Sequence, residues 1–181
     1  MSTNPTVIEH IRQLVEHEKL FPYVLAHRRP KRRLFLTAGA FGELTRPDSA
    51  FGVLGVQPKI HVVFEHWVRG LEVWVDPDGK PRLLKPLFPP EPDVFELMIL
   101  EPGAQVRAFC LFAEPDTLIV SHMNTRQLLG KRNSQQWRDA KALCMENWSD
   151  LFNSPPFRPA GPRPHNLRSY VTENCDDLLI K

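Results

Sequence analysis

The chain has 181 residues, of which 42% are hydrophobic and 24% are charged, and its formal net charge is +2. A chain of this length buries roughly 70% of the surface that it exposes when unfolded, so it can fold without a disulfide or a structural metal. The composition excludes a wholly disordered chain, and no run reaches the ~18 apolar residues that a membrane span requires. The sequence therefore predicts a soluble protein that has no membrane partner.

The three cysteines, Cys110, Cys144 and Cys175, lie far apart and show no CxxC spacing. Such spacing predicts neither a disulfide framework nor a zinc knuckle, and buried core thiols are the expectation for Cys110 and Cys144. The polar start of the chain does not resemble a secretory signal. A reducing, cytoplasmic location is the prediction that follows.

Apolar residues recur at helical spacing from Val7 to Val15 and predict an amphipathic helix that ends near Lys19 to Pro22, with Asn4 as a possible cap. A basic run then extends from His27 to Arg33 without an acid. Such a run can bind nucleic acid or can be a solvated surface, and both interpretations stay open. The candidate RNA-binding residues in it are Arg28, Arg29, Lys31, Arg32 and Arg33.

The next predicted elements are a short strand over 34–37, a loop-rich segment over 37–58 and a helix in the second half of 60–71. A hairpin around an Asp-Gly turn is predicted over 73–84. Three stronger strands follow, and the short connections between them favour antiparallel pairing. Their predicted ranges are 94–100, 106–112 and 117–123.

A cationic loop is predicted over 124–131, before a helix capped by Asn133 or Ser134 whose apolar stripe includes Trp137. The Pro-rich tail is predicted to lie outside the core. The predicted fold is therefore α+β, with an antiparallel β-meander packed by helices. It divides into an N-terminal helix with a basic linker (1–33), an α+β domain (34–153) and a C-terminal tail (154–181).

Motifs for nucleotide, metal or nucleophilic chemistry are weak in this sequence. No GxGxxG follows a predicted strand, and neither GxxxxGK[ST] nor GxSxG occurs. His61, Glu65 and His66 miss the HxxEH spacing by one residue, which disfavours a metal hydrolase. The sequence therefore predicts neither a metal nor a cofactor.

The most coherent candidate site combines Arg107 with the segment after the third strong strand. Antiparallel pairing would place Arg107 beside Arg126, Lys131 and Arg132, and cations in that arrangement can stabilise the growing negative charge of a phosphodiester transition state. His122 is the candidate general acid or base. The alternative is that Arg107 only forms a cross-strand ion pair with Glu96 or Glu114.

The order and spacing of this region resemble the RelE/HigB-like toxin superfamily over roughly residues 60–152. Those proteins are ribosome-dependent mRNA endonucleases of bacterial toxin–antitoxin modules. The resemblance rests on Phe95-Glu96-Leu97, Gly103, Val106-Arg107-Ala108-Phe109, Leu118-Ile119-Val120-Ser121-His122-Met123, Thr125-Arg126, Gln136 and Asp139-Ala140.

This resemblance implies an endoribonuclease whose partners would be a cognate antitoxin and an mRNA on the ribosome. It implies that Arg107 and Arg126 contact the scissile phosphate, that His122 transfers a proton, and that Lys131 and Arg132 bind RNA. The sequence departs from the family pattern at Met98, where an arginine is usual, and at Val106, where an aromatic residue is common. The alternative is a catalytically degenerate mobile-element or phage accessory protein that binds protein or nucleic acid.

Overall fold

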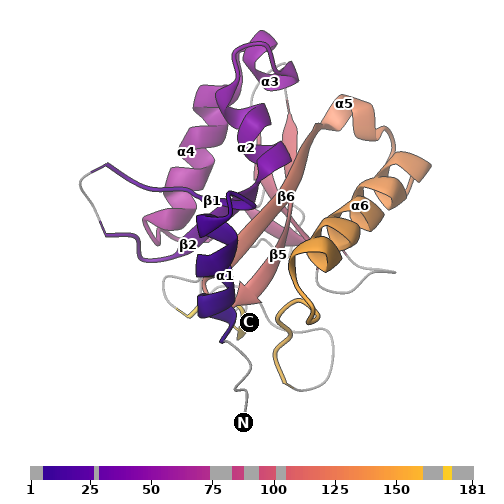
Figure 1. Ribbon diagram of the computed structural model, residues 1–181. Coiled ribbons are helices and arrows are strands. Elements are labelled where there is room, and N and C mark those ends of the chain that lie inside the picture. Colours follow the sequence, from indigo (N-terminus) through magenta and orange to yellow (C-terminus); the bar gives the residue numbers. More distant parts are fainter. Residues whose placement is uncertain are drawn as a thin grey trace.

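A six-stranded sheet forms the centre of the protein (Figure 1). The computed structural model describes residues 6–26, 29–73, 83–87, 94–100, 105–160 and 169–172. The strand order across the sheet is β1-β2-β6-β5-β4-β3. The strands are β1 (Leu20–Pro22), β2 (Arg33–Thr37), β3 (Leu84–Pro86), β4 (Phe95–Ile99), β5 (Val106–Glu114) and β6 (Thr117–Thr125).

Helices cover both faces of this sheet, and Figure 1 shows α4 and α6 on opposite sides of it. One apolar cluster lies between the sheet and α2, α3 and α4, and a second cluster joins the other face to α1 and α6. The helices are α1 (Val7–Glu16), α2 (Ala38–Thr45), α3 (Ala50–Val53), α4 (Gln57–Val68), α5 (Arg126–Leu129) and α6 (Gln135–Leu151).

Strand β5 lies inside the sheet and is buried on both faces. Val106, Ala108 and Cys110 pack in the cluster under α2, α3 and α4, while Phe109 and Leu111 pack in the cluster under α6. Successive side chains of a strand point to opposite faces, so residues of β5 enter the two clusters in turn. The three predicted antiparallel strands are confirmed as β4, β5 and β6.

The prediction of a wholly antiparallel sheet is wrong, because β2 pairs with β6 in parallel. Parallel neighbours need a long crossover connection, and the helices of residues 38–68 lie within it. The remaining pairings in the described part of the sheet are antiparallel. The fold class is α+β with a mixed sheet.

The predicted loop over 37–58 is also wrong, since α2 and α3 occupy most of it. The side chains of Thr37 and Ser49 cap these helices by accepting hydrogen bonds from backbone N–H groups. The glycines that suggested a loop include Gly52, where an added Cβ would lie 2.3 Å from the carbonyl oxygen of Pro47. That glycine allows a close backbone approach within a helix. Helix α4 likewise begins earlier than predicted, at Gln57.

Other local predictions have mixed outcomes. Thr6, and not Asn4, is the N-cap of α1, where it forms a capping box with Glu9. Ser134 caps α6 as predicted. The predicted cationic loop over 124–131 contains the short helix α5. Most of the predicted hairpin over 73–84 lies outside the described residues.

The C-terminal tail was predicted to lie outside the core, and the structure contradicts this for Tyr170 and Val171. Both side chains are 1% exposed and belong to the cluster under α2, α3 and α4. The Tyr170 ring contacts the rings of Phe95, Phe112 and Phe157 edge-on or tilted. Part of the tail is therefore integral to the core.

Replacing Tyr170 by alanine should lower the free energy of unfolding by about 3–5 kcal/mol, because it leaves a cavity in the aromatic cluster. Ser169→Ala changes an exposed neighbour and should alter stability by less than about 0.5 kcal/mol. Urea unfolding followed by circular dichroism measures both values. Equal stability of the two variants would show that the tail does not support the core.

Candidate functional site: a cationic cavity

The register between β5 and β6 brings the two predicted phosphate-binding arginines together. Val106 lies opposite Thr125, and Arg107 lies opposite Asn124, so Arg126 follows directly after the paired region. The backbone N–H of Arg126 donates to the carbonyl of Gln105 at 2.6 Å. The side-chain oxygen of Gln105 accepts a hydrogen bond from Nη2 of Arg107 at 3.3 Å. The predicted proximity of Arg107 and the basic segment is therefore confirmed.

The turn between α5 and α6 shapes a second wall of the site. Gly130 has a φ angle of 63° and Asn133 one of 66°, a left-handed conformation that glycine and asparagine adopt most easily. The Ser134 hydroxyl donates to the carbonyl of Leu129 at 2.7 Å and accepts from the backbone N–H of Trp137. This turn fixes where Arg132 and the first turn of α6 lie.

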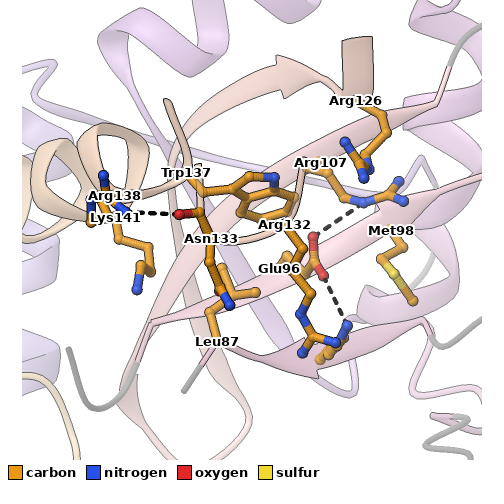
Figure 2. Close-up of a pocket in the computed structure, with 11 residues that line it drawn as sticks. Leu87, Glu96, Met98, Arg107, Arg126, Arg132, Asn133, Trp137, Arg138 and Lys141 are labelled. Atoms are coloured by element: carbon orange, nitrogen blue, oxygen red, sulfur yellow. Dashed lines mark hydrogen bonds and ion pairs between the residues drawn. The ribbon is translucent and has the colours of Figure 1, made fainter. Parts of the chain in front are cut away.

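These elements enclose a cavity of about 350 Å³ beside β4 and β5 (Figure 2). Six cationic side chains and one carboxylate line it within the described part of the chain. This excess of positive charge makes the cavity attractive to an anion. The lining residues are Lys85, Leu87, Glu96, Met98, Arg107, Arg126, Arg132, Asn133, Trp137, Arg138 and Lys141.

A buried ion pair lies at the base of the cavity. Nε of Arg107 is 3.1 Å from Oε2 of Glu96, and both side chains are less than a tenth exposed. Lys85 lies 3.9 Å from the other Glu96 oxygen. Arg107 also donates to the carbonyl of Val106 at 3.1 Å. The proposed alternative role of Arg107, a cross-strand pair with Glu96, therefore coexists with its position in the cavity.

Burial and neighbouring charges act in opposite directions on this pair. Burial raises the pKa of Glu96, whereas Arg107, Lys85, Arg132 and Arg126 lower it, and the net direction is upward. Burial also lowers the pKa of Arg107; Glu96 opposes this effect and Arg126 adds to it. The charges of Arg107 and Arg126 thus repel each other across the cavity, and a bound anion would relieve that repulsion.

Trp137 lines the same cavity, and its indole nitrogen is a buried, unpaired hydrogen-bond donor. Its side chain is 7% exposed, and its Nε1–H has no hydrogen-bond partner among the described residues. The corresponding groups of Trp67 and Trp148 donate to backbone carbonyls at 3.0 and 2.7 Å. Figure 2 shows the Trp137 nitrogen on the side of the ring that faces Arg107 and Arg126, and the Arg126 guanidinium lies 5.8 Å from the ring centroid.

An unpaired buried N–H costs about 1–3 kcal/mol. A ligand oxygen that accepts from Trp137 would remove this cost, and a negatively charged oxygen would form the strongest hydrogen bond. The donor and the surrounding arginines thus favour the same kind of ligand, an oxyanion.

His122 lies outside this cavity. Its ring stacks on Phe109 with the centroids 4.8 Å apart, and Nδ1 lies 3.1 Å from the hydroxyl of Ser121. Burial lowers the pKa of His122 to about 4, so the ring is neutral near pH 7. It lines a separate groove between α2 and α6. The structure does not bring His122 together with Arg107 and Arg126.

The other predicted RNA-binding residues lie in different places. Arg132 lines the cavity, whereas Lys131 is exposed beside it. Arg32 is 1% exposed, contacts the Trp67 ring and donates to the carbonyl of Leu71, so its side chain is part of the packed interior and does not lie on the surface with the rest of the basic run. In the same basic run, Arg33 pairs with Glu114 at 2.8 Å. Arg29 and Lys31 line a different hollow. Arg28 lies outside the described residues.

Sequence reasoning missed the contributions of Glu96 and Trp137 to this site. The role predicted for Glu96 is that of an ion-pair partner for Arg107, although an acid inside an apolar strand is a signal in itself. Trp137 was assigned to the apolar stripe of its helix. The other cavity residues that were not predicted as site residues are Lys85, Arg138 and Lys141.

The histidine-based metal motif shows ordinary contacts. His61 contacts the Tyr23 hydroxyl at 3.1 Å, and His66 contacts the carbonyl of Glu72 at 2.7 Å. Glu65 pairs with Arg69 at 3.5 Å. Within the described residues, no group of three or more His, Cys, Asp or Glu side chains is placed so that it could hold a metal ion.

Comparisons with known proteins add no relatives. The chain has no significant match to a protein-family model, a curated protein or a solved structure. Among the described residues, no helix has the length and apolar character needed to cross a membrane.

Replacing His122 by phenylalanine should remove part of the acid sensitivity of the fold. Because the folded-state pKa is about 4 and the ordinary value is 6.5, the stability linked to His122 is complete above pH 6.5 and is lost as the pH falls towards 4. Between pH 6.5 and pH 4, the free energy of unfolding of the wild type should fall by up to about 3 kcal/mol more than that of the variant. Urea unfolding at pH 7, 5.5 and 4.5 measures the difference, and parallel losses in both proteins would contradict it.

Proposed function

We propose that the protein is a ribosome-dependent mRNA endonuclease, the toxin of a type II toxin–antitoxin module. The observation that carries this proposal is the convergence of Arg107, Arg126 and the unpaired N–H of Trp137 on one cationic cavity. The cavity is the site at which the scissile phosphate of the message binds.

The donors in the cavity suit a phosphodiester that passes through a pentavalent transition state. Negative charge grows on the nonbridging oxygens as the attacking oxygen approaches phosphorus. Arginine presents several N–H groups in a fixed plane, which lets it bind two phosphate oxygens at once. Because Arg107 is held by Glu96 and Gln105, its donors are oriented before the substrate arrives.

The cavity also offers apolar contacts. Leu87, Met98 and the Trp137 ring lie among the cations. Nucleotide bases stack on aromatic rings and guanidinium planes, and RNA recognition commonly uses unstacked single-stranded bases. A message threaded through the ribosomal decoding region is single-stranded, which fits these contacts. The strand order β4-β5-β6 followed by a cationic turn and α6 supports the resemblance to the RelE/HigB-like toxins.

An RNA-binding module without catalysis is the second candidate. Met98 lines the cavity at the position where the resemblance predicts an arginine, and His122 lies elsewhere. A protein of this kind would bind RNA in the same cavity and leave it intact. Under either proposal, an antitoxin or other regulator would act by covering the cavity with acidic side chains.

Arg126→Ala should lower message cleavage by at least 100-fold, because it removes one donor to the developing phosphorane. The measurement is primer extension on messages from a cell-free translation reaction, with and without ribosomes. Arg46→Ala is the matched control, since Arg46 is an exposed arginine that ends α2, under the opposite face of the sheet. It should leave cleavage unchanged.

Cleavage by wild type that requires ribosomes is the result expected for a toxin. RNA binding that Arg126→Ala weakens, without cleavage by any variant, would establish the binding module instead. If a folded Arg126→Ala variant cleaved the message at the wild-type rate, the scissile phosphate would not bind in this cavity.

A further inference from the structure

The groove that contains His122 differs in its chemistry from the cationic cavity. Figure 1 shows α2 and α3 on one side of the end of β6, and α5 and α6 on the other, and the groove lies between them. It holds about 350 Å³, whereas a cavity of roughly 150 Å³ is enough for a benzene ring. Phe51 and Met123 line it and are almost fully buried. No arginine or lysine of the described residues lines it, so its ligand is not an anion.

Large apolar side chains stand exposed around this groove. Leu128 on α5 is 68% exposed and Leu143 on α6 is 42% exposed, and both line the groove. Val53 and Leu54, which are also exposed, follow the lining residue Ala50 by three and four positions and so lie on the same side of α3. Apolar side chains that gather around a hollow in this way mark a surface that another molecule covers.

Acidic side chains border the groove on both of its walls. Glu43 on α2 lines it. Asp139 and Glu146 are exposed on α6, four residues before and three residues after Leu143, so they share its side of the helix. None of these three acids forms an ion pair within the described part of the chain. His122 adds no positive charge near pH 7, because burial lowers its pKa to about 4.

The wall formed by α2 and α3 is low because its residues are small. Gly39, Ala40 and Ala50 line it, and an added Cβ at Gly39 would meet no atom within 4 Å. Leu128 and Leu143 form the taller wall opposite. Small residues on one side of a groove let the backbone of a partner element approach closely, while large apolar side chains on the other side pack against it.

We propose that this groove is a docking site for a basic amphipathic helix of a partner protein. Apolar side chains of that helix, spaced at i, i+3, i+4 and i+7, fill the groove. Lysine or arginine side chains beside this stripe pair with the acids of α2 and α6. The inference goes beyond the proposed function and does not depend on it, since the groove shares no lining residue with the cationic cavity.

Charge argues against the other occupants. Nucleic acid binds through cations that contact its phosphates, and the described residues that line the groove include none. A second copy of the chain, packed through the same surface by a twofold axis, would set Asp139 and Glu146 against their own counterparts. An acidic helix would bind the cationic cavity instead.

Two synthetic peptides, titrated into the full chain and followed by nitrogen-15 spectra, test the proposal. Both are cross-linked to stay helical and carry leucines at the spacing given above; one has lysines beside the leucines and the other has glutamates. The lysine peptide should shift the backbone resonances of Met123, Leu128 and Leu143. The glutamate peptide should leave these three resonances in place.

Variants of exposed residues separate the apolar and the charged contributions. Leu143→Ser should weaken binding of the lysine peptide about 10-fold, because it removes one apolar wall. Val62→Ser is the matched control, since Val62 is 63% exposed on α4 and does not line the groove. Glu146→Lys should weaken binding about 5-fold, and Glu72→Lys, an exposed acid beyond the end of α4, should not change it. Fluorescence anisotropy measures the four dissociation constants.

The proposal is wrong if the lysine peptide leaves the groove resonances unchanged, or if the glutamate peptide shifts them equally. It is also wrong if wild type forms a dimer in sedimentation equilibrium that Leu143→Ser dissociates, because a second copy would then occupy the groove. If Leu143→Ser does not fold, Leu128→Ser removes the exposed leucine of α5 and decides the same question.

Discussion

The buried pair of Arg107 and Glu96 is the interaction on which the site depends. Strand β5 is buried on both faces, so a cation near its start needs a partner that compensates for lost hydration. Glu96 on the neighbouring strand supplies it at 3.1 Å. Removing one member of such a pair leaves an uncompensated buried charge, which costs about 3–5 kcal/mol. The pair therefore couples the stability of the sheet to the chemistry of the cavity.

The sheet also explains why the remaining cations face this pair. Strands β5 and β6 end side by side, so the chain that leaves β6 at Thr125 must turn over the Arg107 side chain. The α5 turn and the left-handed residues Gly130 and Asn133 then direct the chain back into α6. Arg126, Arg132 and Trp137 come from this short return. A cavity whose walls come from packed strands and a capped helix is preorganised for an anion.

The sequence predicts β4, β5 and β6 correctly, because short apolar runs separated by turn residues are a local signal for strands. The glycine-rich segment over 37–58 was predicted as a loop, because the burial of Ala40 and Phe51 that stabilises α2 and α3 is a tertiary effect. The parallel pairing of β2 and the burial of Tyr170 likewise depend on contacts between distant segments.

The site shows the same division between local and tertiary information. The proximity of Arg107 and Arg126 follows from strand pairing, so the sequence could predict it. The sequence could not predict that His122 lies in another groove. That position depends on how α2 and α6 pack beside the last residues of β6. The unpaired N–H of Trp137 is visible only once the whole hydrogen-bond network is known.

The most direct test of the account is the indole N–H resonance of Trp137 in nitrogen-15 spectra during titration with a short single-stranded RNA. We predict that this resonance moves, because its unpaired donor gains a phosphate oxygen. The resonances of Trp67 and Trp148, which already donate to carbonyls, should stay in place. RNA binding that leaves the Trp137 resonance unchanged would contradict the account, since the cavity would then not be where the phosphate lies.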